Sequence, residues 1–242
     1  MSETVVILGA GAPDGVGGAL ARKFAKNGLN VIVSGRTQEK LNATTKEIEA
    51  DGGSAEGCVA DVTSEADLDA LFKRVEDRQE PLAAVLFNAG SNLPVPFEDL
   101  TPAMFEEFWR IGCYGAFLTA KKAMPILKQQ GQGSMLFTGA SASLRGRPGF
   151  GHFAATKAAL RNLVQALARE YGPQGIHVAH VVIDGIINGD IVRGRYGEYL
   201  ESLGEDGSLA PDAIAQAFWV LHTQHRSAWT HELDLRPFNE KW

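Results

Sequence analysis

The feature of this sequence that most constrains its fold is a regular alternation of short apolar runs with longer amphipathic stretches. The apolar runs are rich in β-branched residues, and nearly every interval between them spaces its apolar residues as a helix does. Helices that join successive strands are crossover connections, so we expect the strands to be parallel. The strands are expected at residues 4–8, 30–34, 56–60, 83–88, 134–138, 177–183 and 232–235.

Helices are expected on both faces of this sheet. The runs from Val5 to Leu8 and from Val31 to Val33 are apolar without interruption, which is typical of parallel strands that are buried on both faces. Between the fifth and sixth strands, apolar residues from Leu160 to Leu167 recur at helical spacing and form a core-facing stripe. The sequence therefore predicts an α/β fold with a doubly wound, Rossmann-like parallel sheet of about seven strands.

Length and charge favour one domain that binds small molecules. A chain of 242 residues, 45% of them hydrophobic, can bury a sizeable core, so we expect a single domain over residues 1–242. Residues 185–210 are rich in glycine and charge and are expected to form a flap over the substrate site. The net charge of -6, without a run of Lys and Arg, argues against nucleic acid or an anionic membrane as partner.

The two cysteines indicate a reducing compartment. Neither Cys58 nor Cys113 has a second Cys or His at metal-ligand spacing, so we expect buried free thiols and neither a disulfide nor a metal site. No apolar stretch reaches the roughly 20 residues that span a bilayer, and residues 1–4 lead directly into a strand without the features of a signal peptide. The sequence predicts a cytoplasmic protein.

A glycine-rich turn follows the first strand. Gly9, Gly11, Gly15 and Gly17 lie between that strand and a helix that begins near Val16. Glycines at such a place let backbone N–H groups approach a pyrophosphate at the positive end of the helix. A tight strand–helix connection without a ligand would use the same residues. The position after a strand and before a helix favours dinucleotide binding.

The end of the second strand indicates which dinucleotide is bound. Sites that use NAD usually place an acidic residue here to bind the ribose hydroxyls. This chain instead has Ser34, Gly35 and Arg36, and a guanidinium favours a 2′-phosphate. NADP(H) is therefore preferred and NAD(H) is possible. The alternative is that Arg36 is a surface residue at the start of the next helix.

The segment that runs from Ser134 through Arg145 and Gly149 to Phe153 and Lys157 resembles the active-site segment of the short-chain dehydrogenase/reductase family. The resemblance extends from the first strand to Pro237. It implies that Gly11, Gly15 and Gly17 keep the family's glycine spacing, with Ala10 in place of the usual Thr. If Gly9 is instead the first glycine of the motif, the loop is longer than the family's pattern.

Two further matches concern the cofactor. The resemblance implies that Asp61 and Val62 border the adenine and that Asn88, Ala89 and Gly90 form the family's Asn-Ala-Gly turn. For Asp61, an N-terminal cap of the following helix is an equally open reading. Where the family usually has Pro-Gly after the sixth strand, this chain has Asp184-Gly185, and the resemblance places both beside the cofactor.

The resemblance also implies a mechanism. In this family a Tyr transfers the proton to or from the substrate oxygen, a Lys lowers the pKa of that Tyr and binds the ribose, a Ser orients the substrate, and an Asn supports a water relay. Gly112, Ala140 and Phe153 stand at the Asn, Ser and Tyr positions, and Lys157 is retained. Phe153 is not a proton donor. The alternative for Lys157 is a solvated residue on a helix.

Other side chains near the predicted rim of the cleft could replace the missing donor. The candidates are Ser141, Ser143, His152, Tyr114 and Asp184. Of these, we expect Ser141 to act with Lys157 as a catalytic residue. Neighbouring residues on a helix point about 100° apart, so His152 is expected to face away from the cofactor as a surface or interface histidine.

These observations lead to three hypotheses. The first is an NADP(H)-dependent oxidoreductase of a small carbonyl compound, alcohol or activated alkene. The second is a non-catalytic NADP(H)-binding regulatory or scaffold protein, and the third is a Rossmann-like domain for another nucleotide-bearing ligand. The helices expected at residues 103–129 and 152–171, with the aromatic segment 238–242, resemble the surfaces through which the family forms homodimers and homotetramers.

Overall fold

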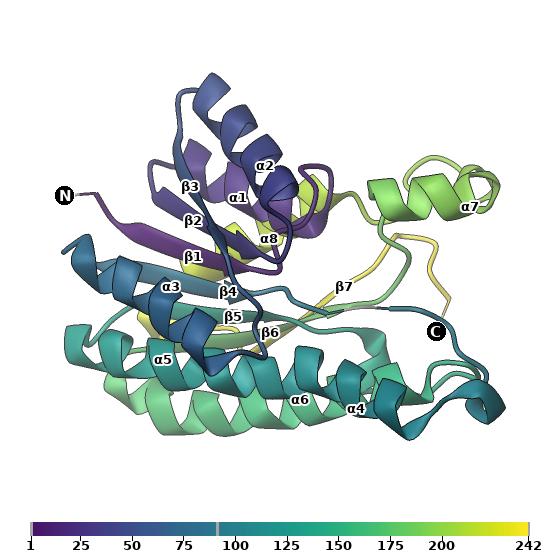
Figure 1. Cartoon of the computed structure of the whole chain (residues 1–242). Helices are drawn as coiled ribbons and strands as arrows, with labels where there is room; N and C mark the ends of the chain where they lie inside the picture. Colours follow the sequence, from purple (N-terminus) through teal and green to yellow (C-terminus); the bar gives the residue numbers. More distant parts are fainter. Residues whose placement is uncertain (1, 91, 242) are drawn as a thin grey trace.

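Seven parallel strands form one sheet in the computed structural model, which describes residues 2–90 and 92–241 (Figure 1). The strand order is β3-β2-β1-β4-β5-β6-β7, and every neighbouring pair is parallel. The predicted doubly wound fold is therefore confirmed. The strands are β1 (Thr4–Leu8), β2 (Asn30–Gly35), β3 (Ser54–Val59), β4 (Leu82–Phe87), β5 (Ser134–Thr138), β6 (His177–Ile183) and β7 (Glu232–Leu235).

The apolar pattern locates six of the strands to within one residue and the edge strand β3 less well. β1, β5, β6 and β7 begin and end where the sequence predicts. β3 begins at Ser54, two residues before the predicted start, because its backbone pairs with the whole of β2 from Asn30 to Gly35. Ser54 is exposed, so its side chain carries no burial signal that could mark the start of the strand.

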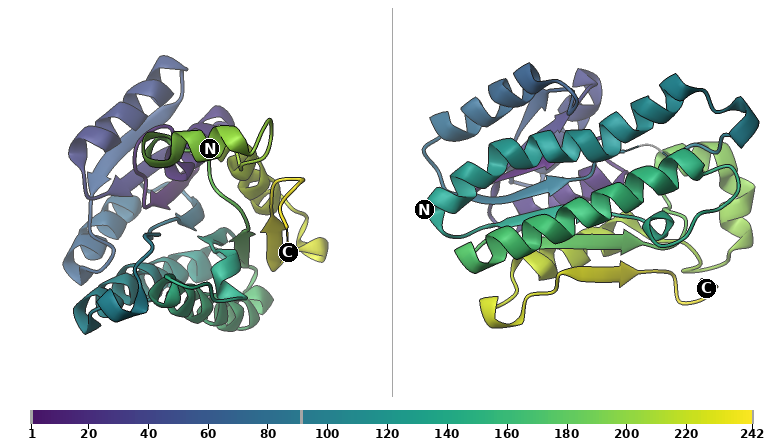
Figure 2. Two further views of the ribbon diagram at one scale, coloured as in Figure 1. Left: turned by 90° about the vertical axis from the view of Figure 1, so that its right-hand side faces the viewer. Right: turned by 90° about the horizontal axis from the view of Figure 1, so that it is seen from below.

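Helices cover both faces of the sheet (Figures 1 and 2). On one face α1 (Val16–Lys26), α2 (Gln38–Ala50) and α8 (Pro211–His222) enclose one apolar core, and on the other α3 (Glu65–Asp77), α5 (Gly115–Gln130) and α6 (Gly151–Tyr171) enclose a second. The predicted stripe on α6 faces the second core. Short 3-10 turns are η1 (Phe97–Asp99), η3 (Ser141–Ser143), η4 (Gly172–Gln174) and η5 (Arg226–Ala228).

The segment predicted as one helix over residues 103–129 contains an irregular turn. α4 (Pro102–Trp109) continues through a turn of π-helix, η2 (Arg110–Tyr114), into α5. Gly112 lies in this turn, and a Cβ built on it would be only 2.5 Å from Cγ2 of Thr156 on α6. The absence of a side chain at Gly112 therefore permits the close approach of η2 to α6.

The segment at residues 185–210 leaves the sheet at the carboxyl ends of the strands, and α7 (Asp190–Ser202) lies beyond those ends (Figure 1). A single parallel bridge between Ile187 and Leu209 joins the two ends of the segment. Tyr196 has non-helical backbone angles and kinks α7. The proposed flap role of this segment stays a prediction.

Cys58 and Cys113 are buried free thiols, as predicted, and burial raises the pKa of both. Among the described residues, no helix is both long and apolar enough to cross a membrane.

Buried histidines form polar contacts between the last strands of the sheet and the helices beside them. His180 of β6 is fully buried, and its Nδ1 lies 3.0 Å from Oε2 of Glu232 on β7. Glu232 also accepts two hydrogen bonds of 2.7 Å from Arg161 of α6, which together with His180 lower the pKa of its carboxyl to about 2. At the end of α8, Nδ1 of His222 lies 2.7 Å from Oγ of Ser134. Burial lowers the pKa values of His180 and His222 to about 4.

These two histidines should make the fold sensitive to mild acid. Each binds a proton near pH 6.5 when unfolded but only near pH 4 when folded, so their contribution to stability decreases as the pH falls from 6.5 toward 4. The pKa of Glu232 is also lowered by folding, but from 4.5, so its contribution to stability should be lost only as the pH falls below 4.5. We expect each histidine to lower the free energy of unfolding by about 2 kcal/mol between pH 7.5 and pH 5.0.

Urea titrations at pH 7.5 and pH 5.0 measure this effect. His222→Gln should remove about 2 kcal/mol of the pH dependence. His225→Gln, which changes an exposed histidine of the same region, is the matched control and should retain the wild-type difference. An unchanged pH dependence in His222→Gln would contradict the assignment.

The contact between Gly112 and Thr156 gives a second prediction. Gly112→Ala forces a methyl group against Cγ2 of Thr156, and we expect a loss of about 1 to 3 kcal/mol in the free energy of unfolding. Thr156→Ser deletes Cγ2 but keeps the hydroxyl that donates to the carbonyl of His152 at 2.8 Å, so most of that loss should disappear in the double mutant. Gly194→Ala, at a helical glycine with open space around it, is the control for helix propensity. An equal cost of Gly112→Ala in both backgrounds would contradict the steric explanation.

Candidate functional site

A cleft of about 660 Å³ lies at the carboxyl ends of the strands. It begins beside the turn after β1 and extends across the ends of β4, β5 and β6 to α7. β1 and β4 are neighbours in the sheet although two strands and three helices separate them in the sequence, so the strand order reverses here. Open α/β sheets bind ligands at this reversal, and the volume suits a ligand of cofactor or substrate size.

The turn after β1 is compact, and glycine is required at two of its positions. Gly9 has a φ of +79°, and its α-carbon packs against the backbone of Ala89. A Cβ on Gly17 would lie 2.7 Å from the carbonyl oxygen of Gly9. Gly11, in contrast, has open space beside it on the cleft, and Gly15 directly precedes α1. Gly9 and Gly17 close the turn, whereas Gly11 leaves room for a ligand.

A chain of hydrogen bonds joins this turn to α6. Asn88 Nδ2 donates to the carbonyl oxygen of Gly9 at 3.1 Å, and Thr138 Oγ1 donates to Oδ1 of Asn88 at 2.9 Å. Lys157 Nζ donates to the carbonyl oxygen of Thr138 at 2.7 Å. The bonds cross the ends of β1, β4 and β5 and fix the floor of the cleft.

Lys157 is a buried cation in this floor. Its side chain is 6% exposed, so the alternative of a solvated helix lysine is wrong. Burial lowers the pKa of Lys157 to about 8. Its Nζ lies 5.7 Å from the centre of the Phe153 ring, one helical turn earlier, and a Cβ on Gly90 would be 3.6 Å from it. Lys157, Phe153 and Gly90 all line the cleft, as does Ala140.

A second charged group of the cleft follows β6. Asp184 directly follows β6, is 2% exposed, and accepts a hydrogen bond of 2.7 Å from Nη2 of Arg145. Burial would raise the pKa of Asp184, but hydrogen bonds from Ser141 and Arg145 outweigh it and hold that pKa below its usual value. Nη2 of Arg236 lies 3.9 Å from Oδ2 of Asp184. The sequence prediction that Asp184, Gly185 and Ser141 border one cavity agrees with their positions, and Arg145 is a partner that it missed.

The other candidate donors lie outside the cleft. His152 is fully buried, with Nε2 3.1 Å from the carbonyl oxygen of Leu93 and its ring 4.2 Å from that of Phe108. The expectation of a surface or interface histidine is therefore wrong, because α4 and the chain before it cover this side of α6. Ser143 is buried, and Tyr114 stacks on aromatic residues of α4 and α5. Neither lines the cleft.

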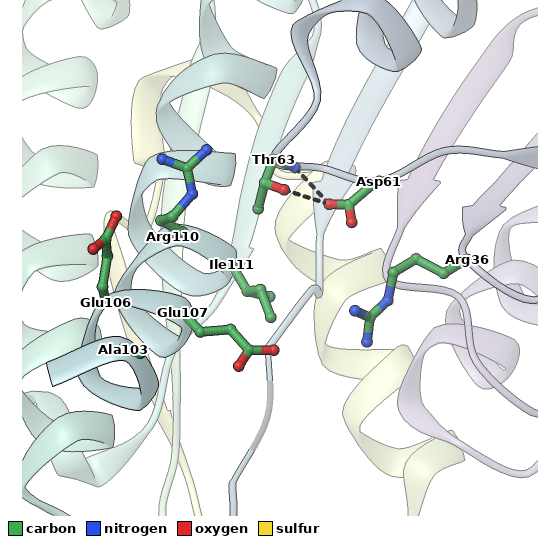
Figure 3. Close-up of a pocket in the computed structure, with 8 residues that line it drawn as sticks. All are labelled: Arg36, Asp61, Thr63, Ala103, Glu106, Glu107, Arg110 and Ile111. Carbon is green, nitrogen blue, oxygen red and sulfur yellow. Dashed lines mark hydrogen bonds between the residues drawn. The ribbon is translucent and has the colours of Figure 1, made fainter. Parts of the chain in front are cut away.

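A smaller pocket of about 330 Å³ lies beside β2 and β3 (Figure 3). Arg36 lies on one side of it, and Glu107 and Arg110 from the α4 region lie on the other. Asp61 also lines it and accepts hydrogen bonds of 2.8 Å from the N–H and the hydroxyl of Thr63.

The charge and the local role of Asp61 follow from these contacts. Burial would raise its pKa, but the bonds from Thr63 and the charges of Arg36 and Arg110 lower it below the usual value. Ser64 caps α3 by accepting from the N–H of Asp67, so the reading of Asp61 as the helix cap is wrong.

Most of the predicted cofactor residues therefore line one of two cavities. The exceptions are Val62 and Ala89, which are buried: Val62 packs against Gly115, and Ala89 packs behind Gly9. Sequence reasoning missed Arg147 and Tyr199, which line the large cleft, because neither belongs to a recognisable motif. Among the described residues, no group of three or more His, Cys, Asp or Glu side chains is arranged to hold a metal ion.

Comparison with known proteins identifies the family. Residues 3–196 match the family model described as short chain dehydrogenase. The chain is 32% identical over 205 residues to the oxidoreductase asL5 of Sarocladium schorii, a match that covers 85% of this chain and 77% of the relative. The crystal structure of a short-chain dehydrogenase from Rhodopseudomonas palustris is 36% identical, with a TM-score of 0.82 and coverage of 98% and 99% of the two chains.

A 7α-hydroxysteroid dehydrogenase, solved with NADH and 7-oxo glycochenodeoxycholic acid, is 26% identical and has a TM-score of 0.88, with coverage of 98% and 93%. The matching residues include the glycine-rich turn, the Asn88 turn and Lys157, which the fold brings to one cleft. By sequence, by fold and by the arrangement of this cleft, the chain belongs to the short-chain dehydrogenase family.

Proposed function

We propose that this protein is an NADP(H)-dependent oxidoreductase that acts on a small carbonyl compound, an alcohol or an activated alkene. The observation that carries the proposal is the buried ammonium of Lys157, which the Thr138–Asn88–Gly9 hydrogen bonds join to the glycine-rich turn. A buried ammonium without a carboxylate partner costs stability, and a role in ligand binding explains why it is kept at a ligand-sized cleft. The related 7α-hydroxysteroid dehydrogenase, solved with NADH, supports a nicotinamide cofactor.

The residues of the cleft fit such a cofactor. The open space at Gly11 and the amino-terminal end of α1 suit a pyrophosphate, and Lys157 is available to a ribose hydroxyl. Asn88 and Gly90 line the middle of the cleft. A bound nicotinamide supplies or accepts a hydride. The chain's own residues would hold the cofactor, exclude water and orient the substrate.

The smaller pocket supports a preference for the phosphorylated dinucleotide. It lies beside the ends of β2 and β3, where this fold places the adenosine half of a dinucleotide. Arg36 and Arg110 both line it, and neither has an ion pair with a carboxylate among the described residues. Asp61, Glu106 and Glu107 also line the pocket and oppose a phosphate. We infer that the two guanidinium groups outweigh them because a guanidinium can bind a phosphate directly in a bidentate manner.

We therefore expect NADPH to bind about ten- to a hundredfold more tightly than NADH. Arg36→Ala should remove most of this preference, and Glu107→Gln should widen it because a repulsive charge is lost. Arg169→Ala, at an exposed position on α6, is the control and should not change it. Calorimetric titration of both cofactors into each variant measures the ratio, and equal affinities in the wild type would contradict the assignment.

The source of the proton is the open part of the mechanism. We propose that Phe153, Ala140 and Gly112 occupy the family's Tyr, Ser and Asn positions. No phenol then stands beside Lys157, and Ala140 offers no hydroxyl to the substrate. Water that enters the cleft, or the hydroxyl of Ser141, remains to supply the proton. The loss of three polar groups together favours the second hypothesis, a non-catalytic protein that binds NADP(H).

Restoring the two cleft hydroxyls distinguishes these hypotheses. Phe153→Tyr with Ala140→Ser places a phenol one turn before Lys157, whose charge should lower the pKa of that phenol. If only acid catalysis is missing, the double mutant should oxidise NADPH with small ketones and aldehydes faster than the wild type, by up to about 10²- to 10⁴-fold. Phe150→Tyr adds a phenol elsewhere in the same cleft and should not increase the rate.

Stopped-flow or steady-state absorbance of NADPH measures these rates. A slower double mutant with an active wild type would show that the chemistry uses another donor. If every variant binds NADPH and none oxidises it, the enzyme assignment is wrong and the non-catalytic hypothesis stands.

A further inference from the structure

We propose that the substrate of this cleft is an amphipathic carboxylate, whose anionic group binds to Arg145 and Arg147 and whose apolar part packs against α7. The proposal rests on the proposed function only in that the large cleft is taken as the substrate site. It names a substrate class and two residues that select it.

The first step is the balance between positive and negative side chains that line the cleft. The acidic residues that line it are Asp184, Asp190 and Glu240. Asp184 is paired with Arg145, and Asp190 is paired with Arg193 at 2.6 Å. Of the cations, Lys157 donates to a backbone carbonyl, whereas Arg147 is exposed and has no ion pair within residues 2–90 and 92–241. Apart from Lys157, Arg147 and Glu240 are therefore the two lining charges without an ion pair among the described residues, and the guanidinium of Arg147 is left to bind an anion.

The second step is that Arg145 is held in place. The carboxylate of Asp184 is 2% exposed, and the N–H of Asp184 donates to the carbonyl oxygen of Leu235 at 2.8 Å, so this anion cannot move freely. It accepts a bond from one nitrogen of Arg145, whose side chain remains 30% exposed. A guanidinium has five N–H donors, so others are available to a ligand. Arg145 is thus a pre-oriented donor with lower entropy to lose on binding.

The third step separates this site from the site for the cofactor's phosphates. The glycine-rich turn follows β1, whereas Asp184 follows β6, and β4 and β5 lie between these two strands. Neighbouring strands are about 4.8 Å apart, so the two ends of the cleft are separated by roughly 14 Å. An anion bound by Arg145 and Arg147 is therefore a different group from the pyrophosphate.

The fourth step concerns the rest of the ligand. Ile191 is 64% exposed and Tyr199 is 56% exposed, and both line the cleft from α7. Phe150 and Phe153 line it from the start of α6. Large apolar side chains that stay exposed beside a cavity favour an apolar ligand. A monoanionic carboxylate on an apolar body matches both the arginines and these surfaces better than a phosphate, which carries more charge.

A matched pair of probes tests the proposal. 3-Phenylpropanoate and 3-phenylpropanamide have the same shape and differ in charge, and calorimetry can measure the binding of each to wild-type protein with and without NADPH. We expect the carboxylate to bind roughly tenfold or more tightly than the amide. Arg147→Gln and Arg145→Gln should each reduce the affinity for the carboxylate by about tenfold and leave that for the amide unchanged.

The controls separate this result from the other proposals. Arg169→Gln, at the far end of α6, should keep the wild-type ratio, and circular dichroism confirms that each variant is folded. Equal affinity of the two probes, absence of binding by both up to their solubility limits, or a ratio that neither arginine variant changes would overturn the proposal. A carboxylate preference in a protein that does not bind NADPH would instead overturn the proposed function and leave this site standing.

Discussion

The hydrogen-bond chain from Gly9 through Asn88 and Thr138 to Lys157 is the interaction on which the rest of the site depends. Its members come from the ends of three strands and from α6, so it fixes the positions of four elements where the strand order reverses. Each member is polar and largely withdrawn from water, and removing one would leave its neighbour without a partner, a loss of about 1 to 3 kcal/mol. The same bonds hold an ammonium group in a position that burial alone would oppose.

The packing around this frame restricts which polar side chains could be added to it. Gly112 has no side chain, and the space beside it is occupied by the methyl group of Thr156, which lies directly before Lys157. An Asn at residue 112 would therefore require α6 or Thr156 to move, whereas Phe153 and Ala140 line an open cleft and can be replaced without such movement. The close contact between η2 and α6 therefore excludes a larger side chain at residue 112 but leaves residues 140 and 153 open to substitution.

Much of this structure could be predicted because its signals are local. The strands, the glycine-rich turn and Lys157 depend on residues that are close in sequence. The structure places every strand within two residues of its expected bounds and brings the turn and Lys157 to one cleft. The errors concern contacts between distant segments. His152 is buried by Leu93 and Phe108, and the pairing of Asp184 with Arg145 joins the ends of two strands. No periodicity in the sequence indicates such contacts, because they depend on how the elements pack after they have formed.

The whole chain is acidic, with a net charge of -6, but cations and carboxylates are placed at separate points along its two cavities, and this placement affects binding. Lys157, Arg145 and Arg147 line the large cleft with three carboxylates, and Arg36 and Arg110 line the smaller pocket with three others. Fields are screened within about 8 Å at physiological ionic strength, so a bound ligand responds to these nearby cations and carboxylates more than to distant surface charges. Low-dielectric walls concentrate the field further. The cations lie at separate points along the site, so an anionic ligand is selected by where its charges fall as well as by how many it carries.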